Sequence, residues 1–306
     1  MNKRWMTSAT GLAAAALMSS PALAVPTTAD VVFLVDESGS MAGEHDWLGD
    51  MISGLESGLI SQGVGVSEAN RYSLIGFGGA TSGSHFDPHA HDMDTDADEV
   101  QNWGSAVQFG DATKHLVTNG GTEDGWNALD WAMGMVNSDR REGAAVNFIL
   151  VTDEDRDNEN NSLTKSGLLS GLQRLNALLN VVVNNRFKCD GQSGAIGVAS
   201  NGNGFRADGS GGYTVCEGAG TVGASGDGNT TSDYVDLAMQ SGGAGWDLEI
   251  LRAGDTNQYA DSFTKAFVDI KVQEITEQPP VSVPEPGTLA LLGLGLTGLA
   301  FRRKKS

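Results

Sequence analysis

The stretch Asp30-Val-Val-Phe-Leu-Val-Asp36-Glu-Ser-Gly-Ser40 decides how this chain of 306 residues is expected to fold. Residues 30–36 form an apolar run that ends in a carboxylate, which is typical of a strand buried on both faces of a parallel sheet. The polar turn after it carries small oxygen ligands at alternate positions. A doubly wound sheet has its ligand crevice at this end of its strands. The stretch therefore predicts an α/β fold with a polar site at one edge of the sheet.

The rest of the chain alternates short apolar segments with helical periodicities. Strands are predicted at 72–77, 146–152 and 180–183, and a weaker, peripheral strand at 246–251. Apolar residues three and four positions apart give each predicted helix one face that can cover a sheet. These faces are Leu48, Met51, Ile52, Leu55 and Leu59; Leu129, Ala132, Met133 and Val136; Leu168, Leu172, Leu175 and Leu179; and Phe263, Phe267 and Ile270. The alternation predicts a three-layer, doubly wound, mostly parallel sheet with right-handed crossovers.

One long segment, 187–233, breaks this pattern. Its many glycines and few apolar residues cannot supply a core of their own, so we interpret it as a Gly-rich surface insertion. It contains the only two cysteines, Cys189 and Cys216. An exported chain with an even count permits one disulfide, which would close a loop of about 27 residues and contribute roughly 3 to 4 kcal/mol. Two free thiols are the alternative. No histidine lies near the pair, which argues against zinc binding or thiol catalysis there.

Both ends of the chain have the pattern of targeting signals. Residues 1–24 run from Lys3 and Arg4 through an apolar stretch to Pro-Ala-Leu-Ala24, the order of a secretory signal peptide. Residues 276–287 are predicted to be a linker that contains the motif Pro-Glu285-Pro. Residues 288–306 hold an apolar run, short for a membrane span of about 20 residues, and the basic cluster Arg-Arg-Lys-Lys305.

This tail resembles the PEP-CTERM sorting signal of Gram-negative bacteria. The resemblance implies an exosortase as a partner, which cuts near the Pro-Glu-Pro motif and releases or anchors the protein outside the inner membrane. Membrane association would then be transient or confined to the C-terminal segment. The expected location is the cell envelope, the cell surface or an extracellular matrix such as that of a biofilm.

Between the two signals the chain is strongly acidic. Residues 25–284 hold 13 basic and 38 acidic side chains, a net charge of −25. Such a surface repels nucleic acid and anionic lipid headgroups, and it attracts divalent cations and basic partners. We therefore expect no nucleic-acid partner.

Five oxygen-bearing side chains are expected to meet at the carboxyl edge of the sheet. Asp36, Ser38 and Ser40 follow the first strand, Thr122 follows two glycines, and Asp153 follows the strand 146–152. Hydroxyls combined with carboxylates suit a hard divalent cation, Mg²⁺, Mn²⁺ or Ca²⁺.

In this order the residues resemble the metal-ion-dependent adhesion site of the von Willebrand factor A (VWA) family, over about residues 28–275. The resemblance implies that Ser38, Ser40 and Thr122 offer hydroxyls, and that Asp36 and Asp153 act directly or through water. Glu154 departs from the family pattern, which commonly has glycine there.

The resemblance implies an adhesion or ligand-binding protein in which a carboxylate of a protein or polysaccharide partner fills an open position on the metal. Two alternatives stay open. One is a structural matrix protein whose metal only stabilises the loops, and the other is a metal-dependent hydrolase. We predict that the chain is not an enzyme, because no Gly-x-Ser-x-Gly elbow, phosphate loop or dinucleotide fingerprint occurs.

A second stretch of possible ligands is dense in His and Asp. It holds His85, Asp87, His89, His91, Asp92, Asp94, Asp96 and Asp98. The alternation of Asp92, Asp94 and Asp96 is similar to the start of an EF-hand, but Ala97 and Trp103 stand where that loop needs Gly and Glu. A solvated acidic loop is the favoured interpretation, and looser Ca²⁺ binding is the alternative. The tryptophans Trp47, Trp103, Trp126, Trp131 and Trp246 are expected to pack in the core and not to bind sugars.

Overall fold

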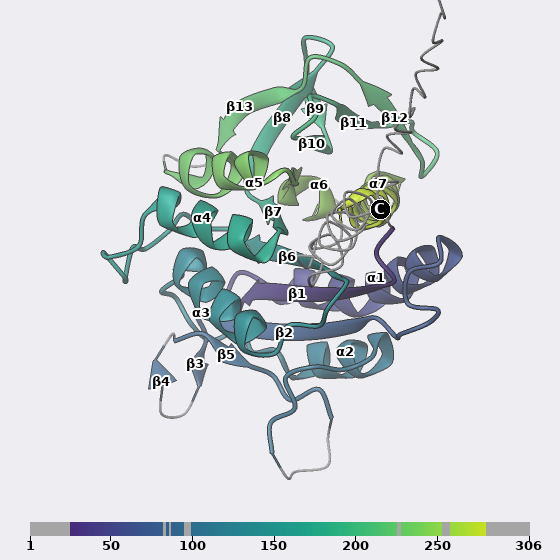
Figure 1. Cartoon of the computed structure of the whole chain (residues 1–306). Coiled ribbons are helices and arrows are strands. Elements are labelled where there is room, and N and C mark those ends of the chain that lie inside the picture. Colours follow the sequence, from purple (N-terminus) through teal and green to yellow (C-terminus); the bar gives the residue numbers. More distant parts are fainter. Residues whose placement is uncertain are drawn as a thin grey trace, which may run out of the picture.

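The first strand lies inside the main sheet of the computed structural model, between β6 (Ala144–Thr152) and β2 (Arg71–Phe77) (Figure 1). The structure describes residues 25–81, 84–85, 87–94, 99–224, 228–252 and 258–279. Its elements are β1 (Thr28–Asp36), α1 (Ala42–Ser61), β2 (Arg71–Phe77), β3 (Ala80–Thr81), β4 (Ser84–His85), β5 (His89–Ala90), α2 (Ala106–Ala112), η1 (Thr113–His115), α3 (Gly125–Ser138), β6 (Ala144–Thr152), α4 (Lys165–Leu175), β7 (Ala177–Val183), β8 (Asn185–Cys189), β9 (Gln192–Ala195), β10 (Gly197–Ala199), β11 (Gly204–Ala207), β12 (Tyr213–Cys216), β13 (Gly220–Ala224), η2 (Thr231–Val235), α5 (Asp236–Ser241), β14 (Ala244–Asp247), α6 (Leu248–Arg252) and α7 (Gln258–Glu277).

The main sheet has nine strands in the order β12-β11-β10-β14-β7-β6-β1-β2-β5. From β14 to β2 every neighbouring pair is parallel, and β5 joins the edge of β2 in the antiparallel direction. The chain leaves β1 toward β2 and later returns on its other side at β6. This reversal makes a topological switch point at the carboxyl ends of β1 and β6. The prediction of a doubly wound, mostly parallel α/β sheet is confirmed.

Helices cover both faces of this sheet. The face of β1 that holds Val31, Phe33 and Val35 packs in the same core as α1 and α7. The face with Val32 and Leu34 packs in the core that α3, α4 and α5 complete. The predicted apolar faces of α1 and α3 are buried at every position. In the fourth predicted helix Phe263 and Phe267 are buried and Ile270 is partly buried.

Two predicted elements need correction at their boundaries. Leu179 was assigned to a helical face, but α4 ends where Asn176 adopts a left-handed conformation with φ 49°, so Leu179 lies in β7. The strand predicted at 246–251 ends at Asp247, whose carboxylate accepts a hydrogen bond from the Glu249 N–H at 3.1 Å as α6 begins. It is also not peripheral, because β14 lies between β7 and β10 and Trp246 is fully buried.

The segment 187–233 is not only a surface insertion, because β10, β11 and β12 extend the main sheet and β13-β8-β9 form a second, smaller sheet (Figure 1). Its few apolar residues pack against the common core. Phe205 stacks on Trp246 with ring centroids 5.4 Å apart. Cys189 and Cys216 form a disulfide between β8 and β12, with Cα atoms 5.7 Å apart. The strands escaped prediction because they are only three to five residues long and rich in glycine.

Candidate functional site

Asp36 is the last residue of β1 and lies fully buried at the switch point. Its Oδ1 accepts the Ser38 N–H at 2.7 Å, and its Oδ2 accepts the Thr152 hydroxyl at 2.8 Å. The first bond folds the residues after β1 into a tight turn, as Asp commonly does through the backbone two residues on. The second ties this turn to the end of β6. The carboxylate therefore stands at the centre of the loops that follow β1 and β6.

The predicted hydroxyl ligands form a chain that ends on Asp153. The Ser40 hydroxyl donates to Asp153 Oδ1 at 2.9 Å, and Ser38 Oγ lies 3.0 Å from Ser40 Oγ. Ser40 and Asp153 are 113 positions apart in the sequence. The fold thus links three of the predicted ligand oxygens in one chain of contacts, with Ser40 between Ser38 and Asp153.

The loop that carries Thr122 packs directly on the same turn. The N–H groups of Asn119 and Gly120 donate to the Glu37 carbonyl at 3.1 and 3.4 Å. Gly120 also lies so close to β2 that a Cβ there would come within 1.4 Å of the Gly78 carbonyl oxygen. Thr122 is therefore placed by its backbone beside the site. Among the five predicted ligands, all of them described, its hydroxyl alone forms no hydrogen bond with another member.

Several carboxyl groups crowd together at this site, and burial and mutual repulsion raise the pKa of two of them. Burial raises the pKa of Asp36 to about 6, against the opposing effect of its bonds from Ser38 and Thr152. Burial first, and then the charges of Asp36, Glu154, Asp157 and Asp153, raise the pKa of Glu123 to about 8. Carboxyls that resist ionisation together are stabilised by a nearby cation. The donor set is made of oxygen atoms, so it fits a hard divalent ion.

Arg252, from α6, is the basic side chain that meets this cluster. Its Nη2 lies 2.8 Å from Asp153 Oδ2 and 3.1 Å from the Ser40 carbonyl oxygen, and its Nε lies 2.6 Å from Glu44 Oε1. The guanidinium thus holds Asp153 by the oxygen that faces away from Ser40. It leaves Oδ1 directed toward the hydroxyls.

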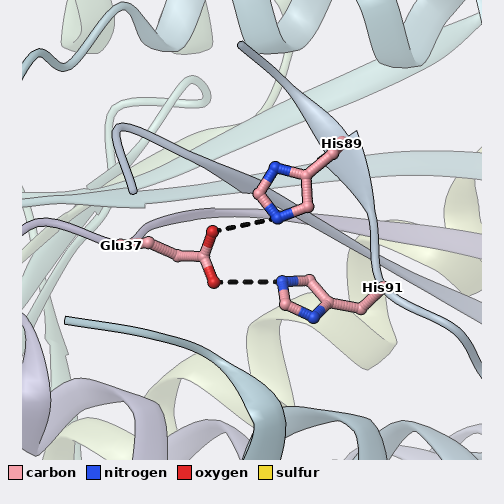
Figure 2. A group of neighbouring side chains, drawn as sticks. All are labelled: Glu37, His89 and His91. Atoms are coloured by element: carbon pink, nitrogen blue, oxygen red, sulfur yellow. Dashed lines mark hydrogen bonds and ion pairs between the residues drawn. The ribbon is translucent and has the colours of Figure 1, made fainter. Parts of the chain in front are cut away.

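A second group of side chains lies beside the first and was not predicted as a set. Glu37, from the turn after β1, meets His89 and His91 of the β5 segment (Figure 2). Glu37 Oε1 lies 3.1 Å from His91 Nε2, and Oε2 lies 3.2 Å from His89 Nε2. Burial opposes ionisation of Glu37, but the two imidazoles and the Val117 N–H outweigh it and lower its pKa to about 2. The sequence showed His89 and His91, but nothing in it linked them to Glu37.

The comparisons with known proteins begin at the tail. Residues 282–304 match the family model described as the PEP-CTERM protein-sorting motif. The chain carries this sorting signal. The motif implies handling by an exosortase and a final place at the cell surface or outside the cell. No helix among the described residues is long and apolar enough to cross a membrane. The PEP-CTERM segment, and the signal peptide predicted at 1–24, lie outside the described residues.

Solved structures similar to the chain include von Willebrand factor A domains. Proximal thread matrix protein 1 from the mussel byssus, in a form with a zinc-occupied metal-ion-dependent adhesion site, is 13% identical, with a TM-score of 0.37 over 53% of this chain and 37% of that one. The vWF domain of the pilus tip protein Mfa5 from Porphyromonas gingivalis is 19% identical, with a TM-score of 0.30 over 44% and 40%. The match therefore spans well under half of either neighbour. No curated protein matches the chain.

Proposed function

We propose that this chain is an exported binding protein whose site at Asp36, Ser38, Ser40, Thr122 and Asp153 holds a divalent cation, Mg²⁺, Mn²⁺ or Ca²⁺. The observation that carries the proposal is the contact of Ser38, Ser40 and Asp153 beside the buried Asp36. Two loops far apart in sequence bring oxygen ligands together there, at the switch point where doubly wound sheets bind their ligands.

The cation would serve as the point of attachment for a partner. A hard cation held by neutral hydroxyls and few carboxylates remains electrophilic, so it can accept one more anionic oxygen. The partner is then a protein or polysaccharide that presents a carboxylate. Together with the sorting motif, this supports adhesion or matrix attachment at the envelope or surface of a Gram-negative bacterium, and binding in preference to catalysis.

Calorimetric titration of Mg²⁺, Mn²⁺ and Ca²⁺ into the purified chain tests the cation. Asp36→Asn and Ser40→Ala should abolish one binding event. Asp46→Asn is the matched control, because this exposed carboxylate of α1 lies outside the site. A titration unchanged by Asp36→Asn and by Ser40→Ala would refute the proposal.

The role of the cation is tested separately. Surfaces coated with an acidic polysaccharide should retain the protein only when the cation is present, and excess acetate should release it. Cation binding that raises the unfolding temperature, without any retained partner, would favour the structural matrix protein. Turnover of a candidate polymer that requires Asp36 would favour the hydrolase.

A further inference from the structure

We propose that Glu37, His89 and His91 form a second metal site, distinct from the oxygen site at Asp36, that takes a zinc-class divalent transition metal. The three ligand atoms all lie within 4.8 Å of one another. Two imidazole nitrogens and one carboxylate oxygen are a ligand set that zinc uses in proteins, with bonds of about 2.0 to 2.2 Å. A tetrahedral ion would need the ligand atoms about 3.4 Å apart, so only a modest contraction is required.

The strand geometry explains why the histidines converge. His89 pairs with Gly76 across the antiparallel β2–β5 ladder, and the His91 N–H donates to the Leu74 carbonyl at 2.9 Å. Residues two apart on a strand point to the same face, so both imidazoles lie on one side of the sheet edge. Glu37 meets them there, and its Oε1 also accepts the Val117 N–H at 2.9 Å. That bond fixes one carboxylate oxygen and leaves Oε2 directed at His89 Nε2.

The contacts of His89 orient its Nε2 toward Glu37, as joint ligation of a metal requires. His89 Nδ1 lies 3.2 Å from the Asp87 carbonyl oxygen, which can only accept, so Nδ1 carries the proton. Nε2 presents a lone pair once its own proton has left, which metal binding to a histidine requires. It faces Glu37 Oε2, a second acceptor, at 3.2 Å. Both atoms are buried, and their contact is an ion pair that does not have hydrogen-bond geometry. A metal ion would satisfy both, and the bond to Asp87 is the outer contact that ligating histidines usually make.

Space for the group is built into β2 and the loop after it. A Cβ at Gly76 would lie 2.2 Å from Glu37 Oε2 and 2.8 Å from His91 Nε2. A Cβ at Gly79 would lie 3.0 Å from the same Glu37 oxygen. Any side chain at Gly76 would therefore collide with Glu37 and His91 where they meet. The glycines are explained by this close approach, because neither needs an unusual backbone conformation for it.

An ion can reach the site from the surface. His89 is about a quarter exposed, with a side-chain exposure of 26%, whereas the Glu37 side chain is fully buried. His89 also lines a shallow surface groove of about 600 Å³ together with Pro88, Trp131 and Met135. Trp131, which was predicted to pack in the core, is 40% exposed at this groove. The ligand atoms are therefore buried, but only the His89 ring separates them from the surface groove on that side.

Cobalt and zinc binding to the purified full chain tests the proposal. Co²⁺ should produce visible absorption bands typical of nitrogen and oxygen ligation, and Zn²⁺ should displace it at one equivalent. His89→Gln and His91→Gln should weaken Zn²⁺ binding at least 100-fold, since loss of even an outer contact costs about 10- to 100-fold. His115→Gln is the control, because this histidine is exposed and lies outside the group.

Two further measurements keep the test decisive. Asp36→Asn should leave the Co²⁺ bands intact, so loss of the oxygen site and loss of this site are distinguishable. If the histidine variants do not fold, histidine nitrogen NMR of the unaltered chain replaces them. One equivalent of Zn²⁺ should then shift the Nε2 signals of two of the five histidines. Zn²⁺ binding that leaves all five signals unchanged, or an absence of Zn²⁺ binding, overturns the proposal.

Discussion

Arg252 places a positive charge next to the proposed cation, so its removal should tighten cation binding. The guanidinium contacts Asp153 Oδ2 at 2.8 Å, on the side of the carboxylate opposite the Ser40 hydroxyl. A cation on Oδ1 would then lie roughly 6 Å from the guanidinium. At that distance a single and a double positive charge repel by about 5 kcal/mol at an effective dielectric constant of 20. Arg252 is a quarter exposed, so solvent lowers this repulsion to roughly 1.5 to 3 kcal/mol.

Arg252→Gln should therefore bind Mg²⁺ or Mn²⁺ about 10- to 100-fold more tightly than the parent chain. The same change leaves Glu44, which is 3% exposed, without its partner, so the free energy of unfolding without cation should fall by about 3 kcal/mol. Saturating cation should recover part of that loss. Calorimetry measures the affinity, and urea unfolding with and without cation measures the stability.

Lys265→Gln is the matched control for net charge, because this lysine is exposed and pairs with Asp269 on α7. It should change neither affinity nor stability by more than a few tenths of a kcal/mol. An affinity of Arg252→Gln that equals or falls below the parent value would refute the electrostatic reasoning. It would show that Arg252 helps to hold Asp153 in place for the cation.

Three further predictions concern the loop of Thr122, the disulfide and a buried carboxyl group. Gly120→Ala should abolish the Mg²⁺ binding event seen by calorimetry, because its Cβ would collide with the Gly78 carbonyl, whereas Gly121→Ala should not, since no atom lies within 4 Å of a Cβ there. Replacing Cys189 and Cys216 together by Ala should lower the free energy of unfolding in urea by about 3 to 4 kcal/mol, and an unchanged midpoint would contradict this. Burial raises the pKa of Asp247 to about 7, so its stabilising contribution is complete below about pH 4 and is lost as the pH rises through 7. At pH 8 the free energy of unfolding of Asp247→Asn in urea should therefore exceed that of the parent by up to about 4 kcal/mol. At pH 4 the two free energies should be equal.

The meeting of Ser40 with Asp153 beside Asp36 could be predicted from the sequence, because these residues follow recognisable strand ends. Asp36 and Asp153 each follow a long apolar run, and parallel strands bring such ends to one edge of the sheet. The contact of Thr152 with Asp36 was not predicted, although Thr152 directly precedes Asp153. As the last residue of an apolar strand, Thr152 was expected to belong to the core. The role of Arg252 also could not be predicted, since the sequence pattern predicts a strand at 246–251, where α6 begins.

The group of Glu37, His89 and His91 could not be predicted for a different reason. It depends on β5, a two-residue strand that shows no periodicity and pairs with β2 only through tertiary structure. The density of His and Asp in 85–98 pointed to the loop itself as the unit of interest. In the structure His89 instead contacts Glu37, which lies 52 positions earlier in the sequence. Ligand density in sequence therefore located the histidines without giving their third ligand.

The two sites meet at the peptide unit between Asp36 and Glu37. Side chains alternate along a strand, so these neighbours point to opposite faces of the sheet edge. Asp36 turns toward Thr152 and the oxygen ligands, and Glu37 turns toward His89 and His91. The Glu37 carbonyl also accepts the N–H groups of Asn119 and Gly120, which place the Thr122 loop. A metal that fixes Glu37 therefore restrains the same backbone that aims Asp36 and Thr122. By linkage, if the metal at Glu37 raises the affinity of the oxygen site by some factor, a cation at the oxygen site raises the affinity at Glu37 by the same factor.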